Sequence, residues 1–117
     1  MGKKERTKGA TFENEVVKSI SPFFPDAKRN LDQYQQKDGR DFKGTEPLCI
    51  QAKRRKKTQL WEIKMGWIEA REASTINYVY PVVVWRDDQT TPNEDIMCAM
   101  KLEHLIEWLC LQEDGLL

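Results

Sequence analysis

Features that define several common protein classes are missing from this sequence. Its purely apolar runs, such as Val82 to Trp85 and Ile96 to Met100, are at most five residues long, whereas a membrane-spanning helix needs about 20. No apolar stretch follows the basic N-terminus, so no secretory signal is expected. With 39% hydrophobic and 32% charged residues among 117, collagen-like and fully disordered chains are excluded. We therefore expect one small globular domain with no membrane association.

Histidine and cysteine are scarce. The single histidine, His104, excludes most zinc sites and every catalytic triad that needs a second histidine. The three cysteines, Cys49, Cys98 and Cys110, form no CxxC pair and cannot all be paired with one another. Such thiols fit a reducing cytoplasm, where they serve as small apolar residues.

The net charge is +0, but the charges are unevenly distributed. Residues 1–57 hold 15 Lys+Arg against 8 Asp+Glu, which is a net +7, and residues 58–117 hold 4 against 11, a net −7. A basic half favours a surface that faces a polyanion. The alternative is that the two halves mix in space and cancel.

The spacing of apolar residues predicts an α/β protein. Helical spacing covers residues 10–20, 59–73 with Thr58 as the N-cap, and 102–111. Strands are expected around 27–31 and 41–43, over 48–54, over 78–86 as a strand covered on both faces, and over 96–100. Pro81 should lie near the start of its strand or at an edge. Residues 1–9 are expected to form a flexible basic arm, and residues 10–117 a single domain whose mixed central sheet is flanked by helices.

Glu13 is the first anomaly. On a helical projection it falls inside the arc of Phe12, Val16 and Ile20, and a carboxylate among core-facing residues is costly unless it meets a cation, a metal or hydrogen-bond donors. The alternative is that Glu13 lies near the helix end and pairs with a basic neighbour.

The second anomaly lies on the strand 48–54. Gln51 and Lys53 project from the same face of that strand, and a hairpin through Gly44 and Pro47 would bring Asp41 beside them. The alternatives are a solvent-facing strand side and a turn-forming aspartate. Carboxylate, amide and backbone oxygens suit a hard cation such as Mg²⁺, and a lysine beside them can stabilise negative charge on a phosphodiester.

This combination resembles the PD-(D/E)xK nuclease superfamily, and within it the archaeal-type Holliday junction resolvases. The resemblance covers residues 8–57 and is carried by Lys8-Gly9-Ala10-Thr11-Phe12-Glu13-Asn14-Glu15 and by Leu48-Cys49-Ile50-Gln51-Ala52-Lys53. It implies a restriction-endonuclease-like core and a catalytic site of Glu13, Asp41, Gln51 and Lys53. It also implies a Mg²⁺ site, which Mn²⁺ can also occupy, made by Glu13, Asp41, Gln51 and the Ala52 carbonyl.

The sequence departs from this family at two positions. Arg40 precedes Asp41 where the family has a proline, which has no chemical role. Gln51 stands where the family usually has glutamate. An amide oxygen coordinates a cation without contributing charge, so metal affinity should be lower or another carboxylate must help.

Basic residues gather around the candidate site. Lys53 to Lys57 are five consecutive cations, and the alternative for such a run is a solvated segment or a nuclear localisation signal. The residues expected to contact nucleic acid are Lys8, Arg29, Arg40, Arg54, Arg55, Lys56 and Lys57, with Arg29 assigned by the resemblance. No base-reading motif is present, which favours recognition of the shape and backbone of branched DNA.

The expected function is that of a metal-dependent endodeoxyribonuclease of recombination or repair, in the cytoplasm of a bacterial, archaeal or phage-infected cell. Apolar residues nearly all around the helix at 59–73 favour a homodimer. Three alternatives stay open. The first is another DNA nuclease of the same superfamily, restriction-like or acting at replication forks. The second is a non-catalytic nucleic-acid-binding module that retains the fold, and the third is a structural protein whose charge split is incidental.

Overall fold

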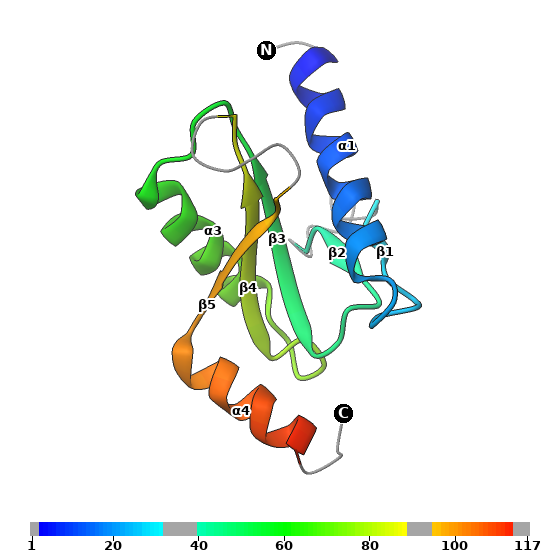
Figure 1. The fold of residues 1–117 in the computed structure, drawn as a ribbon, viewed down its shortest axis with the longest axis vertical. Coiled ribbons are helices and arrows are strands. Elements are labelled where there is room, and N and C mark those ends of the chain that lie inside the picture. Colours follow the sequence, from blue (N-terminus) through cyan, green and yellow to red (C-terminus); the bar gives the residue numbers. More distant parts are fainter. Residues whose placement is uncertain (1–2, 32–39, 89–94, 114–117) are drawn as a thin grey trace.

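The computed structural model of this chain describes residues 3–31, 40–88 and 95–113, with the backbone alone for residues 3–8 and 112–113. Its elements are α1 (Lys3–Ile20), β1 (Lys28–Arg29), β2 (Phe42–Lys43), β3 (Leu48–Arg54), α3 (Leu60–Ala73), β4 (Tyr80–Arg86), β5 (Met97–Met100) and α4 (Leu102–Glu113) (Figure 1). The predicted α/β class with a mixed sheet is confirmed.

Helix α1 begins earlier than the sequence predicts. It starts at Lys3, so residues 3–9 form its first turns, whereas the sequence predicts a helix only from residue 10. Lysine, arginine and glutamate are good helix formers, and one interior glycine costs only about 1 kcal/mol relative to alanine. Gly9 therefore weakens this helix without ending it.

Strand β4 is the centre of the main sheet. It pairs in parallel with β3, from Leu48 opposite Tyr80 to Arg54 opposite Arg86, and antiparallel with β5. Parallel strands need a long crossover connection, which α3 provides. The first five residues of β4 are buried, which confirms the prediction of a strand covered on both faces. Pro81 is its second residue, as predicted.

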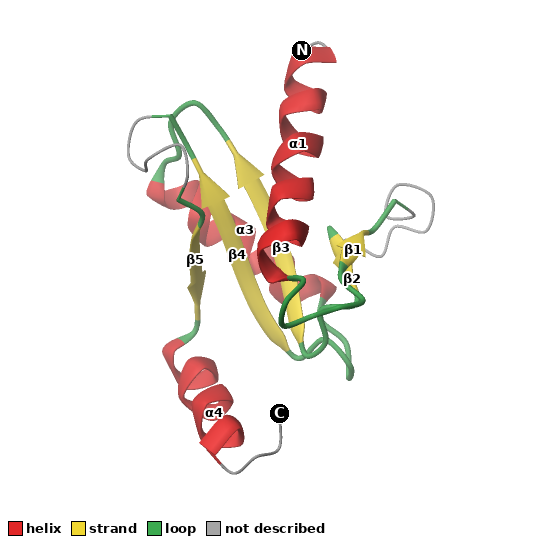
Figure 2. Cartoon of the chain, turned by 45° about the vertical axis from the view of Figure 1, so that its right-hand side comes forward, coloured by secondary structure: helices red, strands yellow, loops and turns green. Residues whose placement is uncertain are grey.

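The two helices α1 and α3 cover opposite faces of this sheet (Figure 2). On one face, Ile50, Val82 and Val84 form the buried core together with Phe12 and Val16 of α1 and with Phe42 of β2. On the other face, Gly66 of α3 approaches Val83 and Lys53. The period-2 alternation of β3 therefore sends Leu48, Ile50 and Ala52 to α1, and Gln51 and Lys53 to α3.

Helix α4 packs on the sheet through one face only. Its Trp108 ring lies 6.2 Å from the Tyr80 ring and 6.4 Å from the Phe24 ring, measured between centroids. A different face carries four exposed apolar side chains, at Leu102, Leu105, Ile106 and Leu109. This stripe has the i, i+3, i+4, i+7 spacing of an amphipathic helix.

Helix α3 is capped by Gln59 rather than by the predicted Thr58. The Glu62 carboxylate accepts a hydrogen bond from the Gln59 backbone N–H at 3.1 Å. The backbone N–H of Thr58 instead donates to Asp87 Oδ2 at 2.9 Å. All three cysteines are free thiols. Within the described residues, no helix combines the length and the apolar character needed to cross a membrane.

Candidate active site

Asp41 is fixed between two strands. Its backbone carbonyl accepts a hydrogen bond from the N–H of Asn30, the residue after β1, at 2.8 Å. Its side-chain Oδ2 accepts another from the backbone N–H of Ala52 at 2.8 Å, in the middle of β3. The predicted approach of Asp41 to the Gln51–Lys53 segment is therefore observed, and a purely turn-forming role for this aspartate does not describe it.

Gln51 and Lys53 lie on the inner side of α3 rather than on a solvent-facing side. Gln51 is 7% exposed, and the Lys53 side chain is 18% exposed. The Lys53 ammonium forms an ion pair with Glu69 of α3, with 2.8 Å between Nζ and Oε2. The sheet face that carries the two polar residues is thus largely covered.

Glu13 forms an ion pair with a basic residue, which was the alternative prediction for this carboxylate. Its Oε1 lies 2.8 Å from Nε of Arg29, and the two side chains are 15% and 28% exposed. Glu15, two positions after Glu13 in sequence, pairs with Arg86 at the end of β4. Two acidic residues of α1 are thereby joined to different strands, which fixes the helix over the sheet.

The carboxyl group of Asp41 is poorly stabilised as an anion. Burial raises its pKa to about 7, even though the hydrogen bond from Ala52 acts in the opposite direction. The negative charges of Glu13 and Glu69 raise the pKa further, and the positive charge of Lys53 lowers it. A shift of this size marks a functional-site candidate, because a buried carboxylate without enough positive charge around it would gain from a cation.

The donor atoms present are of the kind that a hard cation prefers. Among the described residues, no group of three His, Cys, Asp or Glu side chains that could hold a metal is found. The predicted set is different: it combines carboxylates with the Gln51 amide and the Ala52 carbonyl, which are oxygen ligands suited to Mg²⁺. The raised pKa of Asp41 fits such a set, since a divalent cation would compensate its charge.

Most of the predicted DNA-contacting arginines are engaged within the protein. Arg54 pairs with Asp88 at 2.5 Å and is 12% exposed, and Arg55 pairs with Glu62 at 2.9 Å. Lys56 and Lys57 are exposed, and no ion pair with another described residue is found for either. Lys56 and Lys57 are therefore the residues of the basic run that are most accessible to a ligand.

The other predicted contact residues divide into two cases. The guanidinium of Arg40 lies over the ring of Tyr78, 4.3 Å from its centroid, which orients it through a cation–π contact. The side chain of Lys8 lies outside the described residues.

Glu69 is a residue of this site that the sequence does not predict. It lies on α3, sixteen positions after Lys53, and it influences Asp41 electrostatically. The sequence signal would have been a carboxylate placed three residues after a helical glycine, Gly66, on the helix that follows the Gln51–Lys53 strand. Such a spacing is common on helices and does not by itself single out a residue.

Comparisons with known proteins give no relative for this chain. No protein-family model matches it, and no match was found among curated proteins or solved structures. The assignment of a function therefore depends on the residues and geometry described above.

Proposed function

We propose that this chain is a divalent-metal-dependent endodeoxyribonuclease with a restriction-endonuclease-like core, similar in its site to the archaeal-type Holliday junction resolvases. It would hydrolyse phosphodiester bonds of structured DNA during recombination or repair, in the cytoplasm of a bacterial, archaeal or phage-infected cell. The observation that carries this proposal is the Asp41 carboxylate, bonded to the Ala52 N–H at 2.8 Å and influenced by the charges of both Glu13 and Lys53.

Each residue has a role that follows from its position. The Ala52 N–H of β3 binds Oδ2 of Asp41 and so orients the carboxylate. The other oxygen, Oδ1, would bind a ligand. The Gln51 amide and the Ala52 carbonyl would complete the oxygen donors for Mg²⁺ or Mn²⁺. When bound, the cation would supply Lewis-acid stabilisation and a more acidic water. The Lys53 ammonium would stabilise the negative charge that develops on the phosphate.

The exposed end of the basic run supports DNA as the partner. Lys56 and Lys57 directly follow the strand that carries Lys53. The Lys56 carbonyl accepts a hydrogen bond from the Asp88 N–H at 3.0 Å, and Asp87 accepts one from Thr58. These bonds hold the loop against the end of β4, so its lysines form a fixed site for the phosphates that flank the scissile bond.

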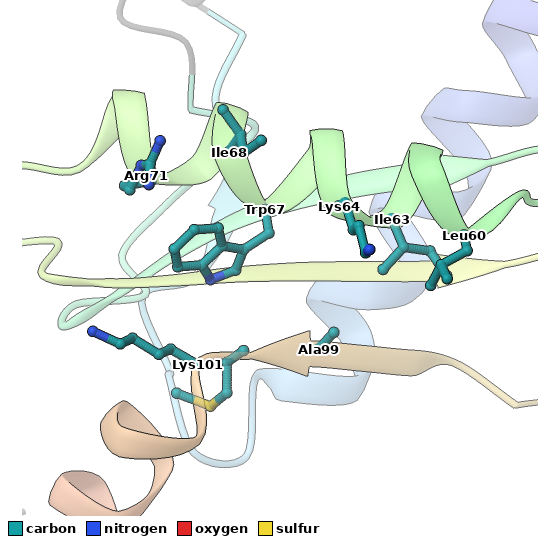
Figure 3. Close-up of a pocket in the computed structure, with 9 residues that line it drawn as sticks. Leu60, Ile63, Lys64, Trp67, Ile68, Arg71, Ala99 and Lys101 are labelled. Carbon is teal, nitrogen blue, oxygen red and sulfur yellow. The ribbon is translucent and has the colours of Figure 1, made fainter.

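Apolar surface around α3 and α4 supports a homodimer as the working form. Leu60, Ile63 and Trp67 project from α3 toward β5 and line a groove of about 550 Å³ (Figure 3). The exposed stripe of α4 begins at Leu102, just after Lys101 at the edge of that groove. Exposed apolar surface of this kind commonly marks an interface. Sedimentation should give a dimer for the wild-type chain and a monomer for the double variant Leu105→Asp/Ile106→Asp.

A second candidate is a DNA-binding module that has lost catalysis. Gln51 favours it, because the amide brings no charge to a cation. The retention of Glu13, Asp41 and Lys53, with the charges of Glu13 and Lys53 both acting on Asp41, favours the enzyme.

Cleavage of defined DNA separates the two candidates. The wild-type chain should cut a four-way junction with Mg²⁺, and linear duplex and single-stranded DNA serve as comparison substrates. Asp41→Asn should lose cleavage by about 100-fold or more and keep its affinity for the junction. A wild-type chain that binds the junction but cuts none of the three DNAs with Mg²⁺ or Mn²⁺ contradicts the nuclease proposal and supports the binding module.

A further inference from the structure

Helix α3 contains a gap that the Lys53 side chain fills. A Cβ atom placed on Gly66 would lie 3.3 Å from Lys53 Cε, 3.5 Å from Lys53 Cγ and only 2.6 Å from a methyl group of Val83. Any larger residue would therefore push the helix from the sheet or displace the lysine stem. The absence of a side chain at this position lets the stem of Lys53 run along α3 beside Gly66.

The same helix provides an anchor for the charged end of that side chain. Glu69 lies three residues after Gly66, so both face the same side of α3. Its Oε2 lies 2.8 Å from Lys53 Nζ, and the lysine side chain is 18% exposed whereas the glutamate is 43% exposed. Gly66 and Glu69 thus form a slot that holds the stem of Lys53 at one point and its ammonium at another.

We infer that Glu69 is a positioning residue, which holds the Lys53 ammonium in one orientation beside Asp41 for the cleavage step. This inference rests on the proposed nuclease function. A lysine has four rotatable side-chain bonds and a flexible stem, so the Gly66 gap alone leaves its end free to turn. Placement of a charged group within a fraction of an ångström strongly affects the rate of a positioned reaction, and the Glu69 ion pair supplies that placement.

The test uses full-length variants in the junction-cleavage assay. Glu69→Ala should lower kcat by about 10-fold to 100-fold while KM and junction affinity stay unchanged. Glu69→Gln should recover most of the rate, because its amide oxygen still accepts a hydrogen bond from Lys53. Glu72→Ala removes an exposed carboxylate from the same helix and should cleave like the wild type.

A double-mutant cycle shows whether Glu69 acts through Lys53. In a Lys53→Ala background, Glu69→Ala should cause no further loss of kcat. If the two losses multiply, Glu69 acts independently of Lys53, and the positioning role is overturned. It is also overturned if Glu69→Ala cleaves like the wild type, or if Glu69→Gln is no faster than Glu69→Ala and both lower the Tm.

These outcomes are distinct from failure of the proposed function. A wild-type chain that cuts no DNA overturns the nuclease proposal together with the role of Glu69. A wild-type chain that cuts, with a Glu69→Ala variant equal to it, overturns the role of Glu69 alone.

Discussion

The side chain of Asp41 accepts a hydrogen bond from the backbone N–H of Ala52 at 2.8 Å. This contact joins the residue before β2 to β3, an outer strand of the main sheet, across eleven positions of sequence. It places a carboxylate next to Gln51 and Lys53, which flank Ala52 on β3. The chemistry proposed for this protein depends on that one contact more than on any other.

Asp41 should make the stability of the protein fall as the pH rises. Its pKa is raised from 3.8 to about 7 by burial, so the folded state retains a proton that the unfolded state releases. Stability is fully present below about pH 4, falls between pH 4 and 7, and levels off above. The loss from this group is roughly 4 kcal/mol.

Urea unfolding of the wild type and of Asp41→Asn, measured from pH 4 to 8, checks this dependence. The variant should gain stability relative to the wild type as the pH rises. Asp95→Asn changes an exposed aspartate and should follow the wild type at every pH. Parallel pH profiles for the wild type and Asp41→Asn would contradict the burial of an uncompensated carboxyl group.

A divalent cation should stabilise the wild type above pH 7. Binding to the folded state alone adds a free energy that grows with the cation concentration, so saturating Mg²⁺ should raise the Tm by roughly 5–10 °C. Asp41→Asn should lose this shift. An equal shift in both proteins, measured by differential scanning calorimetry, would place the cation elsewhere.

Gln51→Glu should tighten cation binding. The added carboxylate supplies the charge that the amide lacks, and we expect a Kd for Mg²⁺ at least about tenfold lower, equivalent to about 1.4 kcal/mol. Without the cation the variant should be less stable than the wild type, because residue 51 is only 7% exposed and burying another charge is unfavourable.

Isothermal titration calorimetry measures the affinity directly, with Asn77→Asp as the control, because it makes the corresponding change at an exposed position. A Gln51→Glu variant that binds Mg²⁺ no better than the wild type would remove Gln51 from the cation site.

Gly66→Ala should destabilise the fold although alanine is the better helix former. The new Cβ would lie 2.6 Å from a Val83 methyl group, and overpacking of this kind typically costs about 1–3 kcal/mol, which exceeds the gain of about 1 kcal/mol in helix propensity.

Gly9→Ala is the matched control for this substitution, since a Cβ at Gly9 meets nothing within 4 Å. It should stabilise the protein by up to about 1 kcal/mol. Chemical denaturation measures both changes, and a Gly66→Ala variant as stable as Gly9→Ala would show that α3 can move away from the sheet.

Removing Lys56 and Lys57 together should weaken DNA binding in a salt-dependent way. If each contacts one phosphate, the slope of log K against log salt should decrease by about 2. Affinity for the junction is measured by fluorescence anisotropy at several salt concentrations, without a cation that supports cleavage. Lys18→Ala, which removes an exposed lysine from α1, should leave the slope unchanged. A slope that stays at the wild-type value in the double variant would place the DNA on another surface.

The amino-acid sequence by itself determined the elements whose apolar pattern is strongly periodic. The range of β3 follows from its period-2 alternation, and the coverage of β4 on both faces follows from its continuous run of valines. The approach of Asp41 to the Gln51–Lys53 segment follows from a short connection containing Gly44 and Pro47. The start of α1 was missed, because helix formers outweigh a single glycine at position 9.

Only the tertiary structure decided which charges meet. The pairing of Glu13 with Arg29, of Arg54 with Asp88 and of Lys53 with Glu69 joins residues that no spacing relates, because these contacts depend on how α1 and α3 pack on opposite faces of the sheet. Local propensity acts over a few residues, whereas ion pairs form across the distances that folding closes. The sequence therefore predicted most residues of the candidate site, whereas the packing of the helices on the sheet determined which opposite charges pair.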